Sequence, residues 1–309
     1  MHVVIAGGSG FVGKILQDKL IQSGHRVTVL TRDPSNVRET DRLRAVKWLA
    51  SGSNPELELE HVDAIVNLAG ESINGIRWTK AKKTRILNSR IHATREIVRL
   101  IGSLEQKPSV LVNASAVGYY GMSETEVFTE SAQTSANDFL ASVVRRWEEE
   151  ASQAEKFGVR TVYARLGIVL GNGGALPLMA LPYKMGIGGT IGSGNQWVSW
   201  IHVEDAAGLL QFAIEQPNIS GPLNVVSPDS VLMKQFGKIM AEVLRRPHWL
   251  PVPAFLLKAM LGEMSDMLAR GQKAIPEKAE RHHYAYKYEK LPDALRSIFQ
   301  YKGNNIMNS

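Results

Sequence analysis

Short apolar runs alternate with amphipathic stretches along the first half of the chain. Residues 3–6 form an apolar run, glycines follow, and the next apolar positions have helical spacing: Ile15, Leu16, Leu20 and Ile21. This order predicts a strand, a tight turn and a helix. Further β-rich runs, separated by helix-compatible sequence, lie at 27–30, 64–68, 110–114 and 159–164. The alternation predicts an α/β fold with a doubly wound parallel sheet and helices on both faces.

The pattern changes after residue 165. Lys184 is the only formal charge within 166–203, although a chain with 21% charged residues would carry about eight there. A buried strand with glycine loops explains this composition, and so does the wall of a pocket that faces a small ligand. The remaining pattern predicts a strand at 223–226 and helices at 205–214, 234–244, 255–261 and 264–268.

The uncharged stretch at 166–183 approaches the length of a membrane-spanning helix. Glycines and prolines interrupt it repeatedly and predict strand and loop instead. The chain also runs from Met1 straight into its first strand, without a basic leader followed by a long apolar segment. We therefore expect a cytoplasmic protein with no membrane partner.

The composition is that of an ordinary soluble protein, with 309 residues that suffice for one large or two modest domains. The chain has no Cys, which excludes disulfides, thiolate nucleophiles and Cys-rich zinc sites. Histidines and carboxylates remain as metal ligands, but the pair His282 and His283 lacks partners for a metal site. We expect no metal site.

The net charge of +6 is concentrated in one segment. Residues 77–99 hold eight cations and one anion, so the rest of the chain has a net charge of −1. A nucleic-acid-binding surface typically spreads basic residues over a face with interleaved aromatics. The segment has a helical apolar face instead, and the charge gives no reason to expect a nucleic-acid partner.

Arg90 is the cation of this segment that falls on the apolar face of the predicted helix, whereas Arg85, Arg95 and Arg99 fall on the opposite side. A guanidinium on the inward face needs an anionic or hydrogen-bonding partner. A phosphate of a bound ligand would satisfy it, and so would an internal salt bridge.

A glycine-rich turn, Gly7-Gly8-Ser9-Gly10-Phe11-Val12-Gly13, joins the first predicted strand to the first helix. Small residues there allow a tight turn and a close approach of the backbone to a pyrophosphate, which the helix N-terminus attracts. The strand–turn–helix context gives the motif its meaning. It predicts a dinucleotide-binding site.

The second strand ends Leu30-Thr31-Arg32-Asp33, where the residue that contacts the adenosine ribose is expected. An acidic residue directly after the strand favours NAD, whereas an Arg binds a 2′-phosphate through two hydrogen bonds. Arg32 therefore predicts NADP, while the nearby Asp33 keeps NAD open as the alternative.

These residues resemble the short-chain dehydrogenase/reductase proteins of the extended type, the NAD-dependent epimerase/dehydratase superfamily. The resemblance covers nearly the whole chain and rests on the glycine turn, Asn67-Leu68-Ala69-Gly70, Ser115 and Trp200-Ile201-His202-Val203-Glu204-Asp205. Further segments look like an atypical branch, the uncharacterised "epimerase family protein" group with a small C-terminal domain of unknown function: 75–78, 88–90, 167–171, 192–196 and 261–264.

The resemblance implies a Rossmann-type fold with two parts. Residues 1–165 would form the NADP-binding domain, to whose sheet 203–226 returns. Residues 166–309 would form the glycine-rich segment and a smaller C-terminal substrate lobe. The resemblance also implies cofactor contacts by Gly7, Gly10, Phe11, Val12, Gly13, Thr31, Arg32, Leu68, Ala69, Arg90 and Arg165.

Catalysis in the superfamily uses a Ser, a Tyr and a Lys four residues after the Tyr. The resemblance places Ser115 at the Ser position, but Leu140 and Val144 stand where the Tyr and Lys are expected. Tyr119 and Tyr120, just beyond Ser115, are the candidates for a substitute phenol, and a packing role is the alternative for them. His202 precedes a predicted helix, which favours a structural hydrogen bond over a role as an acid.

Two functions follow from these residues. One is an NADP(H)-dependent oxidoreductase or epimerase that acts on a small carbonyl or alcohol, sugar-like or nucleotide-linked. The other is a catalytically quiet NADPH-binding regulator, which the missing Tyr and Lys favour. The resemblance also leads us to expect a homodimer.

Overall fold

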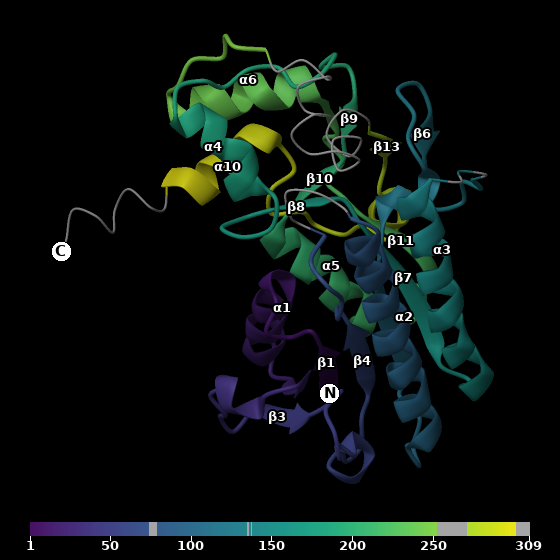
Figure 1. The fold of residues 1–309 in the computed structure, drawn as a ribbon. Helices are drawn as coiled ribbons and strands as arrows, with labels where there is room; N and C mark the ends of the chain where they lie inside the picture. The colour runs from purple at the N-terminus through teal and green to yellow at the C-terminus, as the bar shows by residue number, and fades with distance from the viewer. Residues whose placement is uncertain (74–78, 135, 137, 252–270, 301–309) are drawn as a thin grey trace, which may run out of the picture.

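Seven parallel strands form the central sheet (Figure 1). The computed structural model describes residues 1–73, 79–134, 136, 138–251 and 271–300. The strands lie in the order β3 (Leu43–Lys47), β2 (Arg26–Thr31), β1 (His2–Ala6), β4 (Ala64–Asn67), β5 (Val110–Ala116), β7 (Arg160–Leu166) and β11 (Gly221–Val225). The order reverses between β1 and β4, which is where ligands bind in open α/β sheets. The predicted Rossmann-type α/β fold is confirmed.

Helices cover both faces of this sheet. Successive residues of β1 alternate between two cores, because side chains of a strand point to opposite faces: Val3 and Ile5 belong to one core, Val4 and Ala6 to the other. The first core includes α1 (Phe11–Gln22) and α5 (Val203–Glu215), and the second includes α2 (Lys80–Ser103) and the end of α3 (Phe139–Ser152). Burial on both faces explains the continuous apolar runs of the strands.

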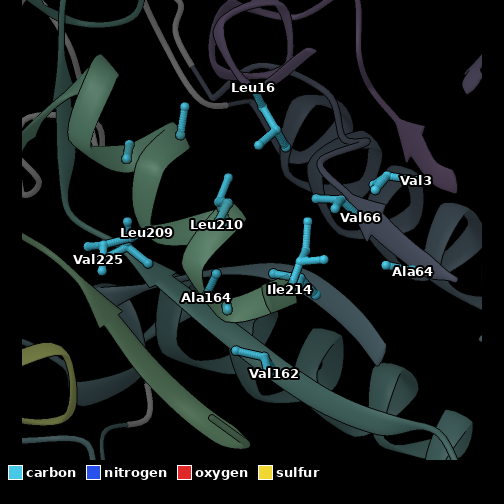
Figure 2. Close-up of a cluster of buried hydrophobic side chains, with 14 of the residues drawn as sticks. Val3, Leu16, Ala64, Val66, Val162, Ala164, Leu209, Leu210, Ile214 and Val225 are labelled. Carbon is cyan, nitrogen blue, oxygen red and sulfur yellow. The ribbon is translucent and has the colours of Figure 1, made fainter. Parts of the chain in front are cut away.

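Helix α5 brings residues from the second half of the chain onto the first sheet. In Figure 2, Leu209, Leu210 and Ile214 of this helix point toward side chains of the strands and toward Leu16 of α1. Strand β11 then pairs with β7 in parallel, with Leu223 opposite Ala164. Residues 203–226 therefore contribute a helix and a strand to the layers built by residues 1–166.

A second, smaller core lies beyond the carboxyl ends of the strands. It is built mainly from α4 (Leu176–Lys184), α6 (Met233–Leu244) and α10 (Leu291–Gln300), with Trp200 and Phe236 fully buried in it. Three short ladders accompany it: β8 (Ile168–Leu170) with β10 (Trp200–His202), β9 (Trp197–Val198) with β12 (Val231–Leu232), and β6 (Val127–Phe128) with β13 (Lys273–Ala274). The short helices are η1 (Pro34–Asn36), η2 (Pro55–Leu57), η3 (Val117–Tyr120), η4 (Gln153–Phe157) and α9 (Glu277–Arg281).

The uncharged stretch at 166–183 differs from the expectation of strand and loop alone. It forms β8 and a glycine loop, and then α4 begins at Leu176. Pro177 fits in the first turn of this helix, where an amide N–H has no intrahelical acceptor. Within the described ranges, none of the helices is long and apolar enough to cross a membrane. The predicted helices at 255–261 and 264–268 lie outside the described residues.

Candidate functional site

The glycine turn after β1 brings backbone amides to the carboxyl edge of the sheet. Gly7 has a φ of +79°, and a Cβ added there would lie 2.7 Å from the carbonyl carbon of Leu68. Only glycine fits such a position without strain. Lys14 donates the first of the helical hydrogen bonds, to the carbonyl of Gly10, so the amides at the helix start precede this ladder and are available to an anion.

The turn is supported by two side chains of α1. Gln17, which the sequence analysis did not single out, is buried and donates its amide Nε2–H to the carbonyl of Gly8. The ring of Phe11 is covered by the loop after β8, where a Cβ on Gly171 would lie 2.6 Å from the Phe11 Cζ. The side chain of Phe11 packs against the glycine loop, so a cofactor contact at this residue would be made by its backbone.

Arg32 and Asp33, which follow β2, have different surroundings. Asp33 caps η1: its carboxylate accepts hydrogen bonds from the Ser35 amide at 3.1 Å, from the Ser35 hydroxyl and from Asn36. The hydrogen bonds from Ser35, followed by the one from Asn36, lower the pKa of Asp33. Arg32 is exposed, and it has no hydrogen bond or ion pair with any residue in the described part of the chain. The carboxylate is thus engaged and the guanidinium is available.

Leu68 and Ala69 continue β4 beside the glycine turn. The Leu68 amide donates to the carbonyl of Ala6, and the Ala69 amide donates to the side chain of Asn67. Asn67 is fully buried and also donates to Thr94 and Asn113, which ties β4 to α2 and β5. The predicted contacts at β4 therefore lie next to the turn and on a rigid support.

Arg90 lies on the inward side of α2, as predicted, and its partners belong to the protein backbone. Its Nη1 donates to the carbonyls of Glu71 at 3.0 Å and Ile86 at 3.1 Å, and its guanidinium carbon lies 5.0 Å from the centre of the Trp147 ring. Burial lowers the pKa of Arg90 to about 10, against the opposing charge of Glu71. These two carbonyls satisfy Nη1. The partners that the sequence led us to expect, a ligand phosphate or a direct salt bridge, are therefore not needed there.

Ser115 and Arg165 both donate hydrogen bonds to the carboxylate of Glu148. The Ser115 hydroxyl donates to Glu148 Oε1 at 2.5 Å, and Arg165 donates from Nε and Nη2 to the two oxygens of Glu148 at 2.9 and 2.8 Å. All three residues are buried, at most 8% exposed. Burial opposes the charge of Arg165, but the hydrogen bonds and charge of Glu148 outweigh it and raise the pKa of Arg165.

The two tyrosines after β5 differ in their surroundings. Tyr120 is buried, accepts a hydrogen bond from Arg165 Nη1 at 3.0 Å and donates to Asn224 Oδ1 at 2.7 Å. Burial raises the pKa of Tyr120, although Arg165 and Asn224 act in the opposite direction. Tyr119 is half-buried, and its ring centre lies 3.5 Å from the guanidinium carbon of Arg165. Its hydroxyl has no hydrogen bond to another described residue.

The positions of the superfamily's Tyr and Lys are occupied by α3 side chains that cannot transfer protons. Val144 is buried and Leu140 is half-buried, and a Cβ on Gly118 would lie 3.7 Å from the Cβ of Leu140. His202 caps α5 by accepting a hydrogen bond from the Glu204 amide at Nδ1. Burial lowers the pKa of His202 to about 4, which agrees with a structural role.

Sequence reasoning missed the partners of the site residues. The sequence patterns assigned no role to Glu148, which binds Ser115 and Arg165, or to Asn224, which binds Tyr120. Glu130 is also buried, and its carboxylate accepts hydrogen bonds from the backbone amides of Asn224 and Lys278. No local motif marks these residues, because they come from α3, from the segment after β6 and from β11, which are distant in sequence.

Comparisons with known proteins agree with this geometry. Residues 3–226 match the model of the NAD dependent epimerase/dehydratase family, and residues 252–298 match a domain of unknown function, DUF1731. The epimerase family protein YfhF of Bacillus subtilis is 51% identical over 300 residues, which cover 96% of this chain and 98% of that protein.

Two solved structures show the same fold. The human epimerase family protein SDR39U1, crystallised with NADPH, is 33% identical with a TM-score of 0.85 and covers 97% of this chain and 99% of its own. The nucleoside-diphosphate sugar epimerase of Corynebacterium glutamicum is 29% identical with a TM-score of 0.78, over 97% of this chain and 58% of its own. These matches confirm the resemblance to the "epimerase family protein" group. The chain belongs to the NAD-dependent epimerase/dehydratase family.

Proposed function

We propose that the protein binds NADP(H) along the carboxyl ends of its strands and acts as an oxidoreductase or epimerase on a small polar substrate. The reacting group is a carbonyl or secondary alcohol, and the substrate class is sugar-like or nucleotide-linked. The human relative with NADPH and the relative named as a nucleoside-diphosphate sugar epimerase support these two parts of the proposal.

The assignment of NADP(H) as the cofactor rests on Arg32, whose guanidinium is available to a 2′-phosphate. A 2′-phosphate needs a cation in reach of the adenosine ribose, and Arg32 is exposed there without a protein partner among the described residues. Asp33, which would favour a free 2′-hydroxyl, is engaged in capping η1. The amides at the start of α1 fit the pyrophosphate. When bound, the nicotinamide supplies or accepts a hydride.

Fluorescence titration with NADPH and NADH tests this assignment. We expect NADPH to bind much more tightly, and Arg32→Ala to weaken NADPH binding by about 10- to 100-fold while NADH binding stays unchanged. Arg26→Ala is a matched control, because Arg26 is an exposed cation at the opposite end of the same strand. Equal affinities of the wild-type protein for the two cofactors would contradict the NADP assignment.

Tyr119 is our candidate for the proton donor. Its hydroxyl is free of hydrogen bonds to the described residues, whereas that of Tyr120 is held between Arg165 and Asn224. The Arg165 guanidinium against the Tyr119 ring fixes the orientation of the phenol. Ser115 donates to Glu148 and keeps its oxygen lone pairs, with which it can accept a hydrogen bond from a substrate hydroxyl.

A screen of carbonyl and alcohol substrates that follows NADPH absorbance tests the catalytic part. We expect Tyr119→Phe and Ser115→Ala each to lower the turnover of any substrate found. Turnover that survives both changes in one protein would contradict the site. Leu140→Ala serves as the control, because this residue lies on α3 near Gly118 and carries no proton-transferring group.

A regulatory protein is the second candidate function. It is favoured by Leu140 and Val144 at the positions of the usual Tyr and Lys. In this case NADPH occupancy changes a partner surface without turnover. Hydrogen exchange with and without NADPH distinguishes the two functions: a regulator shows no turnover and altered protection in the lobe built by α4, α6 and α10, whereas protection changes confined to the nucleotide site contradict it.

A further inference from the structure

Helix α4 is apolar on its outer face as well as on the face that it buries. The buried face belongs to the smaller core that α4 builds with α6 and α10. The outer face presents Leu178, Leu181 and, directly after the helix, Met185, which are exposed and follow one another at helical spacing. A helix at the surface of a globular protein normally carries polar residues on that side. The apolar outer face of α4 therefore indicates that a partner covers it.

Two neighbouring loop segments extend this apolar face. The amides of Trp249 and Leu250 both donate to the carbonyl of Gly188, at 3.0 and 3.2 Å, and the Trp249 indole donates to the carbonyl of Gly186 at 2.9 Å. These bonds hold Trp249 and Leu250 beside the segment that continues from α4. The exposed large apolar side chains form one contiguous group, which we call the α4 patch and in which each residue is 44% to 65% exposed: Leu178, Leu181, Met185, Ile187, Trp249 and Leu250. A single exposed apolar residue needs no explanation, but a contiguous patch marks an interaction site.

A basic cavity borders the α4 patch. It has a volume of about 360 Å³, and it is lined by three cations, one carboxylate, an alanine and a histidine: Lys238, Arg245, Arg246, Glu242, Ala241 and His248. His248 connects the cavity to the patch, because it directly precedes Trp249 and its ring lies against that of Tyr183 in α4, with the ring centres 6.0 Å apart. The cations and the apolar side chains therefore belong to one surface.

The three cations of the basic cavity are available to a ligand. Lys238, Arg245 and Arg246 are exposed, and in the ranges that the structure describes none of their side chains has a hydrogen bond or an ion pair. Elsewhere at the surface, the exposed Arg95 pairs with Glu150. Guanidinium groups bind phosphate oxygens through parallel hydrogen bonds, and a Lys ammonium binds them as a point charge. The cavity is therefore suited to the phosphate groups of a ligand.

The patch and the cavity together favour a lipid surface over a protein partner. A second copy of the chain would bring two such cavities to one interface, each with three cations against one carboxylate, and like charges there repel. The surface of an anionic membrane offers phosphates to the cations and, directly beneath them, an apolar layer to the patch. Trp249 fits this boundary, because tryptophan is enriched at membrane–water interfaces.

We propose that the α4 patch and the basic cavity bind the surface of an anionic lipid membrane. The apolar side chains of the patch enter the boundary between headgroups and acyl chains, and the three cations bind headgroup phosphates. Such binding needs no membrane-spanning segment, so the sequence patterns that speak against a spanning helix do not bear on it. The surface is also separate from the proposed dinucleotide site, because α4 and α6 lie at the opposite end of the molecule from β3, the neighbour of β2 (Figure 1).

Flotation of the full-length, ligand-free protein with lipid vesicles tests the proposal directly. We expect the protein to float with vesicles of equal parts phosphatidylglycerol and phosphatidylcholine, and to stay in solution with vesicles of phosphatidylcholine alone. Raising the salt concentration from about 0.1 to about 1 M should weaken the binding, because salt screens the cations from the headgroups. A protein that does not float with the phosphatidylglycerol vesicles would overturn the proposal, and this comparison needs no variant.

Neutralising the cavity tests the role of its cations. Lys238→Gln, Arg245→Gln and Arg246→Gln in one protein should lower the affinity for phosphatidylglycerol vesicles by about fivefold for each cation removed. The matched control neutralises three exposed cations near β2 and β3: Arg38→Gln, Arg42→Gln and Lys47→Gln. An equal loss in the control would show that only the net charge of the protein matters, and the assignment to the cavity would then be wrong.

The double variant Leu178→Gln and Met185→Gln tests the apolar part. Both side chains are exposed, so the thermal midpoint of the free protein should not change, whereas the affinity for phosphatidylglycerol vesicles should fall by about tenfold or more. Leu57→Gln is the control, because Leu57 is an exposed apolar residue on η2, outside the patch. Wild-type affinity of the double variant would show that the cavity adsorbs anions without the patch, which refutes binding to a membrane surface through α4.

Sedimentation velocity of the same double variant tests the other occupant of the patch. We expect Leu178→Gln and Met185→Gln to leave the oligomeric state of the protein unchanged. A dimer of the wild-type protein that these substitutions dissociate would show that a second copy covers the α4 patch, and it would overturn the assignment to lipid.

Discussion

The two sides of the sheet's carboxyl edge use their polar side chains differently. On the side of β1 and β2, Arg32 is exposed and without a protein partner in the described chain, and the indole N–H of Trp48 is unsatisfied. On the side of β5, β7 and β11, Ser115 and Arg165 share Glu148, and Tyr120 joins Arg165 to Asn224. The first side leaves these groups without a partner in the described chain, whereas the protein itself supplies hydrogen-bond partners to Ser115, Tyr120 and Arg165 on the second side.

This difference changes how candidate residues are interpreted. The residue at a family's functional position indicates what chemistry is possible there. Its hydrogen bonds and ion pairs within the protein decide whether its side chain can also bind a ligand. Arg165 was expected to contact the cofactor, and two of its nitrogens are bound to Glu148. The largest effects on folding should therefore arise on the β5–β7 side, and the largest effects on ligand binding on the β1–β2 side.

Removing the carboxylate of Glu148 should have the largest effect on stability. Glu148→Ala leaves the buried Arg165 without its counter-charge, and we expect a loss of about 3–5 kcal/mol in the free energy of unfolding. Glu150→Ala is the control, since Glu150 on the same helix pairs with the exposed Arg95 and should cost about 1 kcal/mol or less. Urea denaturation measures both. Equal losses would remove the distinction between the buried and exposed pairs.

His202 should make stability depend on pH in a defined window. Its pKa is lowered from 6.5 to about 4 by burial. Above pH 6.5 His202 is neutral in both the folded and the unfolded protein, and its neutral side chain contributes fully to stability. As the pH falls from 6.5 to 4, the unfolded state takes up the proton first, so about 3 kcal/mol of stability is lost.

The variant His202→Asn isolates this effect, because Asn also caps helices and does not titrate. The difference between the wild type and this variant in the free energy of unfolding should change between pH 7.5 and pH 4.5. A constant difference over this range would show that His202 is not held neutral by the fold. Charged neighbours of His202, namely Glu204, Lys287 and Lys19, are present in both proteins.

The two tyrosines offer a smaller and sharper comparison. Tyr120→Phe removes one hydroxyl that serves Arg165 and Asn224, and we expect it to cost about 1–3 kcal/mol of stability. Tyr119→Phe removes a hydroxyl without a partner among the described residues, and it should change stability by at most about 0.5 kcal/mol. Thermal and urea unfolding distinguish them. A larger loss for Tyr119→Phe would invert our assignment of the two phenols.

Arg32→Ala should have the smallest effect on folding. An exposed side chain without protein partners contributes within about 0.5 kcal/mol to stability. The same change should produce the loss of NADPH affinity described above. A destabilised Arg32→Ala protein would show that the guanidinium serves the fold, and the contrast between the two sides of the edge would then fail.

The fold could be predicted from sequence because its signals are local. Each central strand is buried on both faces and therefore forms an apolar run, and glycine positions mark the turn that follows β1. Strand β3 was not identified, because this edge strand has only five residues and the charged Arg44 and Lys47 interrupt its apolar pattern. Helix α4 was missed because glycines and prolines dominate the stretch that contains it, although Pro177 stands where a helix tolerates proline.

The candidate site was predictable only in part. The glycine turn and Arg32 could be identified because their context lies within about 30 residues of one strand–turn–helix–strand unit. The network around Arg165 could not, because Tyr120 and Asn224 are 104 residues apart and meet only through the order β5–β7–β11. For the same reason the sequence did not distinguish Tyr119 from Tyr120.

Helix α5 has a consequence for how the protein is made. It covers the face of the sheet that carries Val3, Val66 and Val162 (Figure 2), yet it spans residues 203–215. A nascent chain that ends at residue 165 therefore exposes this apolar face to water, which favours aggregation and chaperone binding. This sheet and its helical cover can be complete only after the ribosome has added residue 225, the last residue of β11.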